Sequence, residues 1–159
     1  MGFVIRVGEK RDMDSVLKLV NELAVFEREP NAVKINVQDL IENGFKDNPA
    51  FNTFVAEYAG KIVGMALFYN RFSTWKGPSI HLEDLIVTEK FRGKGIGKSL
   101  YDKVLEFAWL KGIQRVEWVV LDWNEPAIQF YKNTGALMLE DWNICQIDHE
   151  SIAKYLGKK

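Results

Sequence analysis

The sequence predicts an α/β (α+β) fold with a mixed, mostly antiparallel sheet that is flanked by helices on both faces. In the middle of the chain, short β-rich segments follow one another across tight turns, which is typical of an antiparallel meander. The later part alternates strand and helix patterns, as in units that contain parallel strands. With 159 residues, 47% of them hydrophobic, the chain is long enough for one sizeable core. We therefore expect residues 1–159 to form a single domain.

The N-terminal part begins with a predicted strand over residues 3–7 and a helix that Asp12 caps. The apolar residues of this helix follow the 3.6-residue period: Val16, Leu19, Val20, Leu23 and Phe26. Residues 28–36 are polar and broken by Pro30, and residues 37–45 predict a short helix that ends before Asn48-Pro49. The stretch from residue 28 to residue 50 is a candidate lid or substrate wall.

The central part predicts three strands. Residues 54–58 and 62–69 are β-rich runs, and the turn at residues 59–61 joins them in a hairpin. A third strand, residues 80–87, follows the loop STWKGPS.

The C-terminal part predicts alternating elements. An amphipathic helix begins near Ile96 and Gly112 closes it, and a strand follows over residues 116–121. Asn124 and Pro126 open a further helix, which Gly135 ends. We expect strands around residues 136–139 and 142–147, and a short helix in the tail.

Composition argues against several classes of function. The net charge is -1 and the positive residues are scattered, so we expect no nucleic-acid partner. We see neither a signal peptide nor a membrane-length apolar run, so we expect a cytoplasmic protein without a membrane partner. Cys145 is the only cysteine, and His81 and His149 lie far apart in the sequence, so we expect no metal site. We expect both histidines to be structural or exposed.

The stretch FRGKGIGKS, residues 91–99, combines three glycines with Arg92, Lys94 and Lys98. A nucleotide-hydrolysing P-loop requires glycine where Arg92 stands, and a dinucleotide fingerprint requires glycine where Lys98 stands. Gly95 and Gly97 allow the backbone to turn sharply toward an anion, and the following helix presents unpaired N–H groups. Both a diphosphate cradle and a solvated surface turn fit the loop alone. Its place between a strand and a helix favours the cradle.

A rival interpretation comes from residues 118–122, WVVLD, which imitate the hydrophobic run and aspartate that hold magnesium in nucleotide hydrolases. The missing first glycine of the P-loop argues against this interpretation.

Two carboxylates interrupt the apolar strand IHLEDLIV. Because a strand alternates its faces, we expect Glu83 to share a side with Leu85 and Val87, and Asp84 to share the side of Leu82. A buried carboxylate requires a cation, donors or a wet cleft. A cleft and a salt bridge at the strand edge both fit this requirement, and we favour the cleft.

Two further side chains are candidates for a site. Asn124 and Tyr131 are separated by two helical turns and are expected on one side of their helix. Tyr131 is interpreted either as a core aromatic or as a proton donor. Trp142, beside Glu140 and Asp141, is a candidate substrate contact.

With LEDLIV, FRGKGIGKSL and LDWNEPAIQFYKNTGA in this order, the chain resembles the GCN5-related N-acetyltransferases (GNAT) over nearly its whole length. The segments ELAVFE, DLIENGF and STWKG are similar to those of the diamine (spermidine/spermine) and thialysine acetyltransferases. The resemblance implies a GNAT-type sheet, acetyl-CoA as cofactor, a small-molecule primary amine as substrate and a homodimer.

The resemblance also implies roles for residues. The backbone of Leu85, Ile86 and Val87 would align the pantetheine arm. The implied pyrophosphate loop consists of Arg92, Gly93, Lys94, Gly95, Ile96, Gly97 and Lys98. Asn124 would contact the cofactor as well. Tyr131, also beside the cofactor, would be the general acid, and Glu83 would remove the proton of the amine, through water. Glu27, Asp84 and Trp142, together with Glu83, would border the amine.

Proton removal is necessary because an alkylamine with a pKa near 10.4 is protonated at pH 7. The difference of about 3.4 units between this pKa and the pH corresponds to a free energy of deprotonation of about 4.6 kcal/mol. Phe26 stands where the diamine enzymes carry tyrosine, and the thialysine enzymes share the phenylalanine. An amino-acid-like substrate with an aminoethyl tail is therefore at least as compatible as a polyamine. A CoA-binding sensor without catalysis and an acetyltransferase of peptide lysine are the alternative functions.

Overall fold

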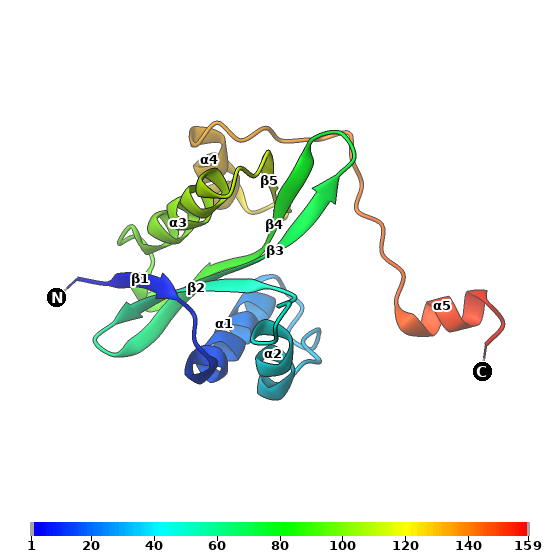
Figure 1. Cartoon of the computed structure of the whole chain (residues 1–159), viewed down its shortest axis with the longest axis horizontal. Coiled ribbons are helices and arrows are strands. Elements are labelled where there is room, and N and C mark those ends of the chain that lie inside the picture. The colour runs from blue at the N-terminus through cyan, green and yellow to red at the C-terminus, as the bar shows by residue number, and fades with distance from the viewer. Residues whose placement is uncertain (1, 159) are drawn as a thin grey trace. The chain divides into compact units, whose positions relative to one another are not determined.

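The computed structural model describes residues 2–158, which divide into two compact units with their sequence boundary between Val119 and Val120 (Figure 1). The first unit contains β1 (Val4–Val7), α1 (Met13–Phe26), α2 (Val37–Gly44), β2 (Asn52–Tyr58), β3 (Lys61–Ser73), β4 (Gly77–Val87), α3 (Ile96–Leu110) and β5 (Arg115–Glu117). The second unit contains α4 (Glu125–Asn133) and α5 (His149–Tyr155). Within the described residues, no helix has the length and apolar character needed to cross a membrane. The expectation of one domain over residues 1–159 stays a prediction.

The first unit is built on a five-stranded sheet in the order β1-β2-β3-β4-β5. The first four strands pair antiparallel, and β5 pairs parallel to β4. Ala59 and Gly60, both with positive φ, form the two-residue turn between β2 and β3. The mixed, mostly antiparallel sheet and its hairpin are therefore confirmed. The last strand is shorter than residues 116–121, since it begins at Arg115 and ends at Glu117.

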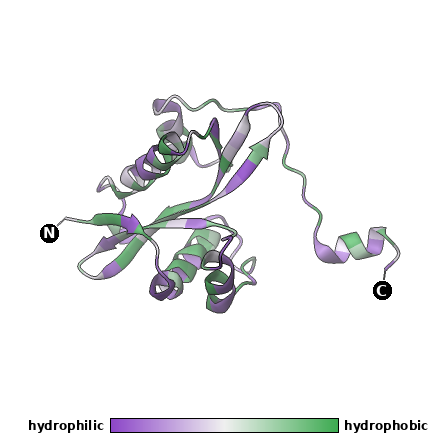
Figure 2. Cartoon of the chain, viewed as in Figure 1, coloured by the Kyte–Doolittle hydropathy of each residue, from purple (hydrophilic) through white to green (hydrophobic). Residues whose placement is uncertain are grey.

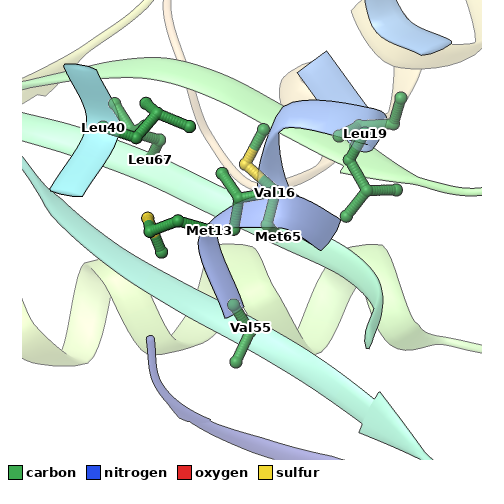
Figure 3. Close-up of a cluster of buried hydrophobic side chains, with 8 residues drawn as sticks. Met13, Val16, Leu19, Leu40, Val55, Met65 and Leu67 are labelled. Atoms are coloured by element: carbon green, nitrogen blue, oxygen red, sulfur yellow. The ribbon is translucent and has the colours of Figure 1, made fainter. Parts of the chain in front are cut away.

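Helices cover both faces of this sheet (Figure 1). On one face, Met13, Val16 and Leu19 of α1 and Leu40 of α2 pack in a cluster with four residues of the strands (Figure 3). These strand residues are Val55, Met65, Leu67 and Ile86. On the other face, Phe107 of α3 lies 5.2 Å from Phe68 and 6.2 Å from Phe54, measured between ring centroids. The helices α1 and α3 both alternate hydrophobic and hydrophilic residues along their length, as their periodicity predicts (Figure 2).

Asp12 precedes α1 as predicted, but its side chain does not cap that helix. Its carboxylate instead accepts hydrogen bonds from Arg6 Nη1 at 2.6 Å, Arg6 Nη2 at 2.9 Å and the Glu9 backbone N–H at 2.8 Å. Asp12 is buried, and the bonds from Arg6 hold the pKa of its carboxyl below the usual range, although burial opposes this effect. The residue therefore ties β1 to the start of α1.

The alternation expected for β4 is wrong at Glu83 and Asp84 because the strand contains a bulge. Asp84 pairs with Leu67 and Leu82 pairs with Phe68, so Glu83 is the extra residue of β4. Since Leu67 and Phe68 point to opposite faces, Leu82 and Asp84 do too. Leu82 lies on the α3 face with Phe68, whereas Asp84 lies on the α1 face with Leu67.

The strands expected around residues 136–139 and 142–147 do not form in the described chain. Apolar side chains in this stretch are exposed: Leu137, Leu139, Trp142, Ile144 and Ile147. A strand needs backbone partners on a neighbouring strand, and the second unit is described with helices as its regular elements. The predicted tail helix is confirmed as α5.

Candidate functional site

A pocket of about 590 Å³ opens on the α1 face of the sheet. Three carboxylates that the sequence analysis placed beside an amine, Glu27, Glu83 and Asp84, all line it. Its apolar lining comes from Val20, Leu23, Ala24, Ala32, Val33, Ile35, Leu40, Phe51 and Leu67. Lys34, Asp39 and Asn43 complete the wall. The first unit therefore brings together the predicted acidic residues, and part of the candidate wall at residues 28–50 encloses them.

The bulge in β4 explains why two successive residues reach one pocket. In a regular strand Glu83 and Asp84 would point to opposite faces, but both line the pocket here. Glu27 follows the last turn of α1, whose C-terminal end therefore contributes the third carboxylate. Local backbone geometry on β4 and packing of α1 on the sheet together create the acidic end of the pocket.

The pocket is electrostatically prepared for a cation. Burial, with smaller contributions from the charges of Glu83 and Glu27, raises the pKa of Asp84 to about 7. Burial also raises the pKa of Glu27, which keeps more contact with solvent. Clustered carboxylates oppose each other's ionisation, and a positively charged group placed among them would relieve the repulsion. Among the residues that line the pocket, Lys34 is the basic one, and its side chain is exposed.

Glu83 has the access that a proton acceptor needs, since about half of its side chain is exposed. Tyr69 lies close to it, and the pKa of this phenol is raised by burial first and then by the charge of Glu83 and a hydrogen bond with it. The phenol therefore stays protonated and donates to the carboxylate. Sequence reasoning missed Tyr69, because only the pairing of β3 with β4 places it beside Glu83.

The glycine loop leaves β4 and leads into α3, as the sequence predicts. Gly93 and Gly95 have φ of 74° and 79°, a left-handed conformation that favours glycine, and Gly95 is the N-cap of α3. Apart from the adjacent residues in the chain, no atom of the described residues lies within 4 Å of an ideal Cβ at either position, so the loop backbone is open to a ligand. The N-terminal amides of the 15-residue α3 provide donors for an anion.

The basic residues of the loop have different partners. Arg92 donates from Nε to the carbonyl oxygen of Val87 at 2.8 Å, and its guanidinium lies 5.2 Å from the centre of the Phe26 ring. Lys94 Nζ lies 4.7 Å from the centre of the Phe91 ring, and Lys98 Nζ lies 2.6 Å from an Asp102 oxygen. Arg92 thus links the loop to β4 and α1, a role that the sequence did not predict. Ile96 is buried. Gly97 is the next residue and lies in the first turn of α3.

The last residues of β4 offer main-chain groups to a ligand. Leu85, Ile86 and Val87 pair with β3, but the pairing with β5 covers only Ser79 to His81. The second edge of residues 85–87 therefore has no strand partner in the described part of the chain. Extended ligands bind such edges through the N–H and carbonyl groups.

The remaining predicted site residues belong to the second unit. Asn124 is the N-cap of α4 and its side-chain oxygen accepts from the Ala127 N–H at 3.4 Å. The amide nitrogen of Asn124 remains as a donor. Tyr131 is buried and its ring lies 5.2 Å from that of Phe130, whereas Trp142 is exposed. The described residues contain no cluster of three or more His, Cys, Asp or Glu arranged to hold a metal ion.

Comparison with known proteins gives consistent results. Residues 15–136 match the Acetyltransferase (GNAT) family. The chain is 37% identical to a thialysine N-epsilon-acetyltransferase of Bos taurus, over 99% of this chain and 100% of the relative. It is 35% identical to the protein of the same name from Caenorhabditis elegans, over 89% of each chain. It is 32% identical to a human spermidine/spermine N(1)-acetyltransferase-like protein 1, over 94% of this chain and 23% of that longer protein.

Solved structures support the fold. An integron cassette protein of V. cholerae superposes with a TM-score of 0.79 at 25% identity, covering 98% of both chains. The family match spans most of the chain, and it includes β4, the glycine loop, α3 and α4. The chain therefore belongs to the GNAT acetyltransferase family and is an N-acetyltransferase.

Proposed function

We propose that this enzyme transfers the acetyl group of acetyl-CoA directly to a primary amine of a small molecule, a thialysine-like amino acid or a polyamine, in a ternary complex. The observation that carries the proposal is the pocket in which Glu27, Glu83 and Asp84 meet on the α1 face of β4. An alkylammonium ion fits this combination of carboxylates and apolar walls, because its charge meets the acids and its methylene groups meet the side chains of α1 and α2.

The proposed roles rest on this placement for residues of the first unit, and on the family resemblance for Asn124, Tyr131 and Trp142 of the second unit. The unpaired edge of Leu85, Ile86 and Val87 would hold the pantetheine arm, and the amides between Arg92 and Lys98 would hold the pyrophosphate. Acetyl-CoA supplies the activated acetyl thioester.

Chemistry then requires two proton transfers. Glu83 removes a proton from the bound ammonium, through water, so that the nitrogen lone pair can attack the carbonyl carbon. Tyr131 would donate the proton of its phenol to the departing thiolate, as the family resemblance implies. Asp84 and Glu27 hold the positive charge of the amine during binding, Asn124 contacts the cofactor and Trp142 borders the substrate.

The names of the relatives support the substrate class. Thialysine and spermidine both present a primary amine on a short aliphatic chain, and the Phe26 ring is shared with the thialysine type. The proposal takes residues 1–159 as one acetyltransferase domain that acts as a homodimer in the cytoplasm, without nucleic acid or membrane as a partner.

The proposal is tested with two variants and release of CoA as the signal. Glu83→Gln should lower the rate most at low pH, where free amine is scarcest, while Glu106→Gln, an exposed glutamate of α3, should leave the profile unchanged. Tyr131→Phe should lower kcat by about 100-fold with little change in the affinity for acetyl-CoA, and Tyr155→Phe in α5 is its matched control. Loss of cofactor binding alone in Tyr131→Phe would contradict the acid role.

A further inference from the structure

A row of three side chains crosses the sheet beside the acidic pocket. Tyr69 of β3, His81 of β4 and Glu117 of β5 lie directly opposite one another in the strand register. The rings of Tyr69 and His81 are stacked, with centroids 5.2 Å apart and an interplanar angle of 29°. Directly opposite residues in a sheet point to the same face, so the three side chains form one continuous contact row.

His81 is enclosed between two carboxylates. Its side chain is only 14% exposed, and its Nδ1 atom is buried without a hydrogen-bond partner. Nε2 lies 3.6 Å from Glu83 Oε2, and Nδ1 lies 3.9 Å from Glu117 Oε1. Both ring nitrogens therefore face groups that only accept hydrogen bonds when ionised.

A neutral His81 cannot donate a hydrogen bond to both carboxylates. A neutral imidazole has one N–H, so it leaves one of its nitrogens opposite a carboxylate with no hydrogen between them. If the N–H is on Nδ1, the space between Nε2 and Glu83 can take one additional proton, held by either atom. The 3.6 Å separation is longer than a hydrogen bond, and a side-chain movement of about half an ångström would let Glu83 and His81 share a proton.

The ion pairs of Glu117 determine which nitrogen of His81 carries the N–H. Glu117 is an ion-pair partner of Arg71 and of Arg115, whose Nη2 atom lies 2.8 Å from Glu117 Oε2. A carboxylate held by two cations accepts hydrogen bonds, so it favours an N–H on the nitrogen that faces it. The groups that face His81 from β3, β4 and β5 are Tyr69, Glu83 and Glu117, and Arg71 and Arg115 lie behind them as partners of Glu117.

We propose that His81 receives, on Nε2, the proton that Glu83 removes from the substrate amine. The N–H bond of the ammonium breaks as a water molecule takes up its proton, and the same water gives one of its protons to Glu83, where an O–H bond forms. That O–H bond then breaks as the Nε2–H bond forms. The product is an imidazolium ion between two carboxylates, which returns its proton to solvent after acetyl transfer. The two carboxylates that flank the ring balance the positive charge of this imidazolium ion.

His81 acts through Glu83 and is a positioning residue, so this inference rests on the proposed role of Glu83. Its first test needs neither substrate nor cofactor. His81 and His149 are the two histidines of the chain, so the His149→Gln variant has one imidazole, whose titration can be followed by NMR. Adding Glu83→Gln should lower the midpoint of that titration, because the acidic neighbour is lost. An unchanged midpoint would overturn the sharing of a proton.

The second test is kinetic. His81→Gln keeps a polar side chain that cannot titrate. It should lower kcat about tenfold at pH 8, where a neutral imidazole can accept a proton, and change kcat little at low pH, which flattens the pH profile, with the KM for acetyl-CoA unchanged. His149→Gln, in α5, should leave all three quantities unchanged. A His81→Gln enzyme with the profile of the parent would refute the inference. If the parent protein acetylates no amine, the proposed function fails, while the NMR titration still decides the coupling.

Discussion

Replacement of Asp84 by asparagine should stabilise the protein at alkaline pH. Burial raises the pKa of this carboxyl from 3.8 to about 7, so the folded protein disfavours the ionised form. As pH rises from about 4 to about 7, the carboxyl is ionised in the unfolded chain and still protonated in the folded one, and stability falls. Above pH 7 the cost is constant. Asparagine is neutral throughout and does not have this cost.

The size of the effect follows from the shift in pKa. About three units at 1.36 kcal/mol each correspond to about 4 kcal/mol, and partial solvent contact reduces this to about 2–4 kcal/mol. The two proteins should therefore unfold with similar free energies at pH 4. At pH 8 the Asp84→Asn variant should be more stable by that amount, while its affinity for the cationic amine should be lower.

Urea unfolding at a series of pH values from 4 to 8.5 measures this difference. Asp47→Asn, an exposed aspartate in the loop between α2 and β2, is the matched control and should show no such trend. An Asp84→Asn variant that is equally or less stable than the parent at pH 8 would refute the interpretation of Asp84 as a carboxylate without a compensating cation.

Three further substitutions test other parts of the structure. Asp12→Ala should lower the free energy of unfolding, measured with urea at pH 7, by about 3 kcal/mol, because it leaves Arg6 without its main partner. This difference should shrink as pH falls below the usual pKa range of a carboxyl, and a difference that does not change with pH would argue against the ion pair. Gly95→Ala should lower the free energy of unfolding by about 1 kcal/mol, because alanine disfavours the positive φ at this position. It should also raise the KM for acetyl-CoA, and an unchanged KM would exclude the loop from the cofactor site. Phe26→Leu removes the ring beneath Arg92 and should also raise that KM, with kcat for the amine little changed.

Local patterns allowed much of the fold to be predicted. The 3.6-residue period of α1 and α3, the turn at Ala59-Gly60 and the order of β4, glycine loop and α3 all depend on neighbours within a few residues. The acidic residues of the pocket were also identified from one short strand and from the resemblance of the sequence to its family.

Long-range pairing accounts for the errors. The bulge at Glu83 arises from the register between β3 and β4, which a period of two along β4 alone cannot reveal. The row of Tyr69, His81 and Glu117 depends in the same way on the pairing of three strands. The strands expected within residues 136–147 were wrong because β propensity indicates a half-buried pleated surface and cannot supply the partner strand.

Acetyl transfer to a small amine is tested most directly by measuring CoA release and the acetylated product when the purified protein is given acetyl-CoA. The amines to compare are thialysine, lysine, spermidine, spermine, putrescine and a lysine peptide. The account predicts turnover on at least one of the small amines, stronger than on the peptide, and its loss in Glu83→Gln at low pH. Tight binding of acetyl-CoA without turnover on any amine would contradict the account and would favour a CoA-binding sensor.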